Sequence, residues 1–272
     1  MSPAPITTNP ISRIQTTLRS RLDQAKPLYI LPREDIVDSV LVPAFEVSDS
    51  VDCMMGFFSS HSLAEIAPGL ATYLARNGKP MRLIVSPYLS LEDQAAIRAG
   101  LKLDEEVAAD LIISLLPDAN DLASHTLACL SWLIKEKRIS IRIALMRVGL
   151  FHTKAWIFRT TTDSAALHGS SNMTKAALKW KREQLTLSRS WKGEEPQYHI
   201  VKLQSEFESL WRGGDEDCRI IDLPKAVERQ LLQNHLPDRE PTPNEFLERR
   251  TPAPPGSVRH HIGPRRITQQ RV

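Results

Sequence analysis

Two side chains able to attack and to hold a phosphate lie two residues apart in this sequence, His152 and Lys154. Aromatic and branched residues fill positions 151–158, which predicts a strand, and alternate residues of a strand share a face. One face would therefore carry His152, Lys154, Trp156 and Phe158. Because a buried lysine needs a partner, an imidazole beside an ammonium is a poor core surface, but it suits an anion such as a phosphate ester.

A second group of phosphate-binding side chains follows a predicted hairpin. After a polar turn, residues 165–167 would form the return strand. Gly169 permits a tight bend, and Ser170 and Asn172 offer a hydroxyl and an amide that can hydrogen-bond phosphate oxygens without adding charge. Because residues 173–178 are expected to be helical, both side chains would lie near a helix N-terminus, where free N–H groups favour anions.

A carboxylate would complete this group. Residues 182–190 predict a third strand with Glu183 near its start. Glu183 could accept a hydrogen bond from one ring nitrogen of His152, which would fix the tautomer and leave the other nitrogen free to attack phosphorus. The sequence therefore predicts a phosphate-ester site assembled from three neighbouring strands.

These residues, in this order, resemble the phospholipase D superfamily, whose motif is H-x-K-x4-D-x6-G-S-x-N followed by a glutamate. The motif positions are matched by His152, Lys154, Gly169, Ser170, Asn172 and Glu183. The motif aspartate would fall at Arg159, which cannot replace it, and the gap before the glycine is a few residues longer than in the motif. Whether Asp163, in the predicted turn, substitutes for the aspartate is left open.

The resemblance implies a role for each residue. One His152 would attack phosphorus to form a phosphohistidine, and a second His152 would protonate the leaving oxygen and then activate water. Lys154, Ser170 and Asn172 would bind the phosphate, and Glu183 would orient the imidazole. No metal or other cofactor is implied, since the lysines take the place of metal ions.

The sequence has a single H-x-K, whereas a site of this type needs two. The resemblance therefore implies a homodimer with one site on its two-fold axis. Residues 30–215 resemble more specifically the one-motif nuclease domains linked to superfamily 2 helicases. Because no GxxxxGK[ST] loop occurs here, this implies a nuclease subunit for nucleic acid, with DNA favoured, that works with a separate ATPase or helicase in a defence or restriction system.

Two other functions stay open at this point. The arginine at the motif's aspartate position is the reason to consider a catalytically degenerate DNA-binding subunit. A phospholipase or phosphatidyl transferase acting on phospholipids is a minority interpretation, because the sequence has no membrane segment, amphipathic anchor or second motif. Trp180, Lys181 and Arg182 could stack on a base and bind backbone phosphates, or could simply connect a helix to a strand. For His168 we favour a structural role.

The composition of the 272 residues is ordinary for a soluble globular protein, with 25% charged and 42% apolar residues. A formal net charge of +3 gives no argument for a globally basic surface. Cys53, Cys129 and Cys218 are far apart and form no C-x-x-C, so neither a zinc site nor a disulfide is expected. Without a signal-peptide pattern or an apolar run of membrane-span length, the sequence predicts a cytoplasmic protein with no membrane partner.

The order of predicted elements indicates an α/β fold, a phospholipase D-like sandwich with a mixed central sheet flanked by helices. Besides the motif strands, we expect strands at 51–58, 81–85 and 139–146, and helices at 11–23, 34–47, 62–76, 91–99, 104–116, 121–137 and 197–211. The domains would be an N-terminal segment 1–25, a nuclease domain 26–215, and a C-terminal helix with a Pro- and Arg-rich, disordered tail 216–272. The tail could be a phosphate-seeking arm or a solvated linker.

Overall fold

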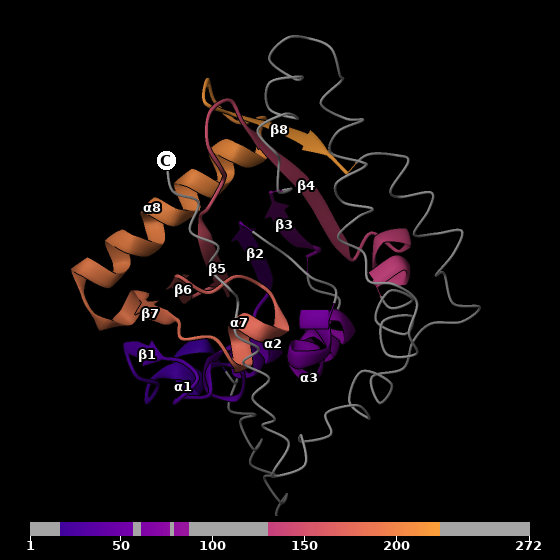
Figure 1. Cartoon of the computed structure of the whole chain (residues 1–272). Helices are drawn as coiled ribbons and strands as arrows, with labels where there is room; N and C mark the ends of the chain where they lie inside the picture. The colour runs from indigo at the N-terminus through magenta and orange to yellow at the C-terminus, as the bar shows by residue number, and fades with distance from the viewer. Residues whose placement is uncertain (1–16, 57–60, 77–78, 87–129, 224–272) are drawn as a thin grey trace, which may run out of the picture.

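The computed structural model describes residues 17–56, 61–76, 79–86 and 130–223 (Figure 1). Their strands form one mixed sheet of eight strands, in the order β1-β7-β6-β5-β2-β3-β4-β8. Helix α8 lies along one face of this sheet, and α2 and α3 lie on the other (Figure 1). The predicted fold class, a mixed central sheet flanked by helices, is confirmed.

The elements have the following bounds. The strands are β1 (Leu28–Ile30), β2 (Ser50–Met55), β3 (Met81–Val85), β4 (Ile139–Met146), β5 (Lys154–Arg159), β6 (Ser164–Gly169), β7 (Gln184–Arg189) and β8 (Cys218–Asp222). The helices are α1 (Leu18–Leu22), the π-helical turn η1 (Val37–Leu41), α2 (Val42–Val47), α3 (His61–Ala75), α7 (Lys175–Lys179), the 3₁₀ turn η2 (Ser190–Lys192) and α8 (Glu194–Trp211).

Strand directions bring several strand ends to one side of the sheet. β2, β3 and β4 run parallel, whereas β5, β6, β7 and β1 alternate in direction outward from β2. The C-terminal ends of β2, β3, β4 and β6 therefore lie beside the N-terminal ends of β5 and β7. We call this side of the sheet the site edge, because the predicted phosphate-binding residues follow or precede these strand ends.

Alternation along β5 divides the core in two. Trp156 and Phe158 are buried in the larger apolar cluster with α2 and α3, where Phe45 makes edge-to-face contacts with both rings. Ala155 and Ile157 are buried on the opposite face with residues of α8. The predicted separation of alternate residues is therefore correct within the strand.

Most predicted elements in the described residues are present, with shifted ends. β3 and β4 match their predicted bounds, and the kink expected near Pro43 is the junction between η1 and α2, where the proline occupies the first turn. A proline has no N–H to donate, so it is tolerated there. The helices predicted at 91–99 and 104–116, most of the one at 121–137, and the tail from residue 224 lie outside the described residues.

Both ends of the described chain contribute to the sheet or its core. Leu18 and Leu22 of α1 are fully buried, although they fall in the predicted N-terminal segment. The Arg189 guanidinium in β7 donates from Nη1 to the carbonyl oxygens of Leu22, Asp23 and Ala25, at 2.8, 3.0 and 2.7 Å. At the other margin β8, which was not predicted, pairs with β4 and extends the sheet to residue 222.

Candidate phosphodiester site

His152 lies at the site edge, just before β5 rather than inside it. The strand predicted from residue 151 begins at Lys154, so the imidazole belongs to the connection between β4 and β5 and is exposed. Gly56, directly after β2, packs against this connection. A Cβ on Gly56 would lie 3.1 Å from His152 Cδ2 and from the Phe151 carbonyl oxygen, closer than most real Cβ contacts. The absence of a side chain at this glycine therefore leaves room for the imidazole.

Lys154 is the first residue of β5 and is only 5% exposed. Its Nζ donates a hydrogen bond of 2.7 Å to the backbone carbonyl of His152, which supplies the partner that a buried lysine needs. Burial lowers the pKa of the Lys154 ammonium below its ordinary value of 10.5, and the negative charge of Glu183 opposes part of this effect. The ammonium is thus held close to the imidazole's own backbone.

The turn after β6 is fixed by hydrogen bonds to β7. Ser170 N donates to the Gln184 carbonyl at 3.0 Å, and Gln184 N donates to Ser170 Oγ at 2.9 Å. Gly169 has a φ of +153°, and a Cβ there would overlap the Gln184 carbonyl oxygen, so the close strand approach requires glycine. Asn172 is half-buried in the same turn, and its carbonyl accepts from Thr174 N at 2.9 Å.

The helix expected at 173–178 begins later, at Lys175, with Thr174 as its N-cap. It has five residues, so its dipole is small and adds little to anion binding. Any anion binding by Ser170 and Asn172 would therefore come from their own polar groups and the turn, not from a long helix that follows them.

Glu183 lies beside Ser170 instead of His152. Its carboxylate accepts a hydrogen bond from Ser170 Oγ, and within the described part of the chain no residue hydrogen-bonds the His152 ring. Continuing the strand register places His152 and Glu183 two strands apart, about 10 Å between backbones. The predicted Glu183–His152 hydrogen bond is therefore not present, and Glu183 affects the site through Ser170 and through the pKa of Lys154.

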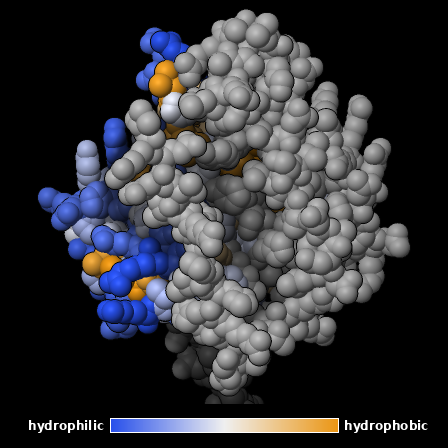
Figure 2. Space-filling model, viewed as in Figure 1, coloured by the Kyte–Doolittle hydropathy of each residue, from blue (hydrophilic) through white to orange (hydrophobic). Residues whose placement is uncertain are grey.

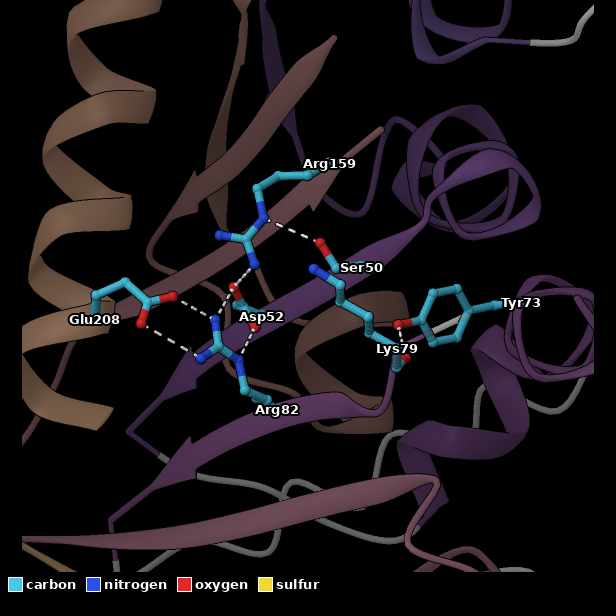
Figure 3. A network of polar contacts seen from close by, with 7 residues as sticks. All are labelled: Ser50, Asp52, Tyr73, Lys79, Arg82, Arg159 and Glu208. Atoms are coloured by element: carbon cyan, nitrogen blue, oxygen red, sulfur yellow. Dashed lines mark hydrogen bonds and ion pairs between the residues drawn. The ribbon is translucent and has the colours of Figure 1, made fainter. Parts of the chain in front are cut away.

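Arg159, at the position of the motif aspartate, lies at the other end of β5, roughly 20 Å along the strand from His152. Its guanidinium donates to Asp52 and, at 3.0 Å, to Ser50 Oγ (Figure 3). Asp163 is in the β5–β6 turn at that same end, with its backbone N–H donating to Thr160 Oγ1 at 3.0 Å. Neither residue contacts the site edge, and Asp163 does not stand in for the motif aspartate there.

The buried charge network around Asp52 was not predicted from the sequence. Arg82 of β3 donates from Nε to Asp52 at 2.6 Å and from Nη2 to Glu208 of α8 at 2.6 Å, so four elements meet at two arginines and two carboxylates (Figure 3). A charged residue inside the apolar runs 51–55 and 81–85 was the available signal, because a charge in a buried strand needs an opposite charge.

His168 is on the opposite face of the sheet from Lys154. Its Nε2 lies 3.1 Å from Ser188 Oγ, and Ser188 Oγ lies 3.3 Å from His199 Nδ1 of α8. Burial, and secondarily the neighbouring His199, lower the pKa of His168. These contacts agree with the structural role favoured from the sequence.

Two further observations concern metal ions and membranes, and both apply to the described residues. In that part of the chain no group of three or more His, Cys, Asp or Glu side chains could hold a metal ion. None of the helices described has the length and apolar character needed to cross a bilayer.

The fold is similar to several solved structures. NucT from Helicobacter pylori aligns with a TM-score of 0.44 and 16% identity, over 71% of this chain and 96% of that protein. Nuc from Salmonella typhimurium, a phospholipase D family member, gives 0.42 and 14% over 72% and 96%. Polyphosphate kinase from Porphyromonas gingivalis gives 0.40 and 11%, over 77% of this chain but only 28% of the kinase. No protein-family model and no curated protein matches the sequence.

Proposed function

We propose that this chain is a phosphodiesterase of the phospholipase D type that cleaves nucleic acid, with DNA favoured, without a metal ion. The observation that carries the proposal is the pairing at the site edge of an exposed imidazole, His152, with the ammonium of Lys154 bound to its backbone. Ser170, Asn172 and Glu183 on the neighbouring turn and strand start support it, because together they provide hydroxyl, amide and carboxylate groups beside that pair.

The chemistry follows from these groups. A neutral nitrogen of one His152 attacks phosphorus, the bond to the leaving oxygen breaks, and an imidazolium gives that oxygen its proton. The resulting phosphohistidine is then attacked by water, from which the second imidazole, now neutral, removes a proton, and the first His152 leaves. Lys154 and the polar groups of Ser170 and Asn172 stabilise the charge that develops on the phosphoryl oxygens.

The second imidazole is His152 of the partner subunit in a two-fold homodimer. One chain offers one H-x-K, and the exposure of the His152 side chain leaves it accessible to a second copy. A two-fold axis passing beside His152 brings the same residue of both chains to one phosphate, since an isologous contact places identical patches opposite each other.

Cleavage of labelled DNA and RNA oligonucleotides in EDTA tests the activity. We expect the wild type to cut and His152→Ala to be inactive with an unchanged thermal unfolding profile. Loss of wild-type cleavage in EDTA with rescue by Mg²⁺ would contradict a site in which lysines hold the phosphate. Analysis of the fragment ends and acid-labile labelling of the protein by ³²P identify the phosphohistidine.

Mixed dimers test the shared site. Wild-type and His152→Ala subunits carrying different tags are unfolded together, refolded and assayed at several ratios. If each site needs both imidazoles, activity follows the square of the wild-type fraction, because mixed dimers are inactive. A linear dependence means that each chain acts alone.

The second candidate function is a catalytically degenerate DNA-binding subunit, which was considered because Arg159 occupies the position of the motif aspartate. Arg159 pairs with Asp52 at the far end of β5 from His152, so this reason is weaker. Oligonucleotide binding without cleavage of any substrate would restore the alternative. Release of phosphatidic acid from phosphatidylcholine or cardiolipin vesicles would instead favour the phospholipid enzyme.

We also propose that the chain works as the nuclease subunit of a defence or restriction system, together with a separate ATPase or helicase. Its support is the resemblance of residues 30–215 to nuclease domains linked to such motors. Affinity purification of the tagged chain under native conditions tests it, and the expected result is a co-purifying ATPase that changes the rate or position of cleavage.

A further inference from the structure

Two apolar side chains are exposed close to His152 along the chain. Val148 and Leu150, on the connection between β4 and β5, are 69% and 43% exposed, and no large apolar side chain of the described residues is more exposed than Val148. Gly149 between them has a φ of +83°, and a Cβ there would meet no atom within 4 Å. Single exposed apolar residues are common, but a pair at an open turn beside a candidate site indicates a contact surface.

The residue after this pair anchors the connection to the core. Phe151 is 5% exposed and belongs, with Phe207 of α8, to the smaller apolar cluster. His152 follows and is exposed, and its carbonyl accepts from Lys154 Nζ at 2.7 Å. Because the residue between them is buried, Leu150 and His152 both lie on the outward side of the connection. The apolar pair and the imidazole therefore belong to one surface.

An acidic turn lies beside the start of the connection. Arg147 N donates to the Asp217 carbonyl at 2.8 Å, which places the connection against the turn before β8. Arg147, Glu216 and Asp217 are exposed. We call Arg147, Val148, Leu150, Glu216 and Asp217 the connection patch. An apolar pair next to charges of both signs can match a copy of itself, because a two-fold axis can set the cation of each copy opposite the carboxylates of the other.

The proposed reaction requires two copies to approach closely at this place. Each reacting nitrogen must come within about 3.5 Å of the phosphorus, so the reacting nitrogens of the two His152 rings lie within about 7 Å of each other. Leu150 is two residues from His152, and two residues span at most about 7 Å. Leu150 of each copy is therefore next to the contact between the subunits.

We propose, building on the proposed function, that the connection patch is the surface through which two copies of this chain associate. Val148 and Leu150 form the apolar core of the contact, and Arg147 of each copy pairs with the partner subunit's Glu216 and Asp217. These carboxylates favour a protein partner over nucleic acid, whose phosphates they repel. Association through the patch completes the site, since it brings the second imidazole to the phosphate.

Self-association measured without substrate tests this interface independently of cleavage. The wild type, Val148→Asp and Leu150→Asp are compared by analytical ultracentrifugation over a range of concentrations, with melting curves to check the fold. A carboxylate in the apolar core should raise the dimer dissociation constant about 30-fold or more, whereas Val201→Asp, at a 50% exposed valine of α8, should leave it unchanged. A monomeric wild type, or equal constants for Leu150→Asp and Val201→Asp, overturns the inference.

Charge exchange tests the same contact without placing a charge in its apolar core. Arg147→Glu leaves the patch with acidic groups alone, and Glu216→Lys/Asp217→Lys leaves it with basic groups alone, so each variant should self-associate more weakly than the wild type. When the two variants are mixed, we expect heterodimers to dominate, because opposite charges again face each other. A pairing within one chain would not produce this preference, and its absence overturns the inference.

The results separate the interface from the proposed function. Dissociation of the dimer by Leu150→Asp, in a protein that cleaves no nucleic acid, would support the interface and contradict the function. Cleavage by a wild type whose dimer is unaffected by Leu150→Asp would support the function and overturn the interface. If nucleic acid covers the patch instead, Leu150→Asp weakens oligonucleotide binding by His152→Ala without changing the mass of the protein, and this result also overturns the inference.

Discussion

Lys154 has the chemistry of a phosphate-binding group that is partly dehydrated before the substrate arrives. Its ammonium donates to a neutral carbonyl, that of His152, and within the described residues no carboxylate forms an ion pair with it. Burial lowers the pKa of its ammonium, and an arriving phosphate would raise it again. If Lys154 binds the phosphate as proposed, substrate binding and protonation of its side chain would therefore be coupled.

This coupling predicts the alkaline side of the pH profile. We expect kcat/KM to fall with an apparent pKa below 10.5, and Glu183→Gln to shift the fall to lower pH, because Glu183 raises the pKa of Lys154. The unfolded chain holds this proton more tightly, so the contribution of Lys154 to stability increases as pH rises from the lowered pKa towards 10.5. Unfolding measured over the same range separates loss of activity from loss of fold.

Gly56 sets the position of the imidazole. In Gly56→Ala, the new methyl group would press on the Phe151 carbonyl oxygen and on His152 Cα, at 3.1 and 3.2 Å. Because small displacements of a reacting group are costly, we expect kcat to fall by about tenfold to a hundredfold. Steady-state kinetics with an oligonucleotide, together with a melting curve, measures the effect, and unchanged kcat would mean that the connection relaxes freely.

At the level of elements, the Asp52 network joins three strands to a helix. Asp52 of β2 is 1% exposed and lies between Arg82 of β3 and Arg159 of β5, while Glu208 of α8 binds the first of these arginines (Figure 3). Arg82 also lies over the Phe207 ring, 4.7 Å from its centroid. These contacts position α8 on the sheet at the end opposite to the site edge.

Neutralising the buried carboxylate should destabilise the fold. We expect Asp52→Asn to lower the free energy of unfolding by about 3–5 kcal/mol, since two arginines lose their buried partner. Glu208→Gln is the matched control: it also contacts Arg82 but is more exposed, so its cost should be about 1 kcal/mol or less. Urea unfolding measures both, and equal values would mean that burial of the charge is unimportant.

Local patterns predicted the elements whose residues alternate or repeat regularly. β4 begins with alternating apolar and polar residues and β3 is almost entirely apolar, and the bounds predicted for both were correct. β1 and β8 were missed because short edge strands depend on a neighbour for their hydrogen bonds. The sequence showed the order of the candidate site residues along the chain. The partners of Glu183 and Arg159 were not predicted, because they depend on which strands are adjacent in the sheet, and residue spacing does not contain that information.

For the molecule as a whole, the described sheet and its core extend beyond the domain bounds 26–215 expected from the sequence. Figure 2 shows mainly hydrophilic residues on the described part of one face, with small apolar patches. The apolar surface of α1 is instead buried: Leu18 and Leu22 are fully covered, and Arg189 joins the end of this helix to β7. The opposite margin is completed by β8.

Two fragments test this organisation. We expect residues 17–223 to unfold cooperatively and residues 26–215 to unfold at a lower temperature or remain partly unfolded. The shorter fragment lacks two buried leucines, each contributing about 1.5–3 kcal/mol, and the strand that pairs with β4. Calorimetry measures both, and identical melting temperatures would show that α1 and β8 are dispensable.

The outermost strands of the described sheet also bear on self-association. β1 has three residues, and β8 exposes a basic and an acidic side chain, Arg219 and Asp222, along its length. A short edge strand and charged side chains along an edge strand both disfavour strand pairing between the sheet edges of separate molecules, which is the route to fibrils. Concentrated solutions should accordingly favour discrete particles over extended polymers.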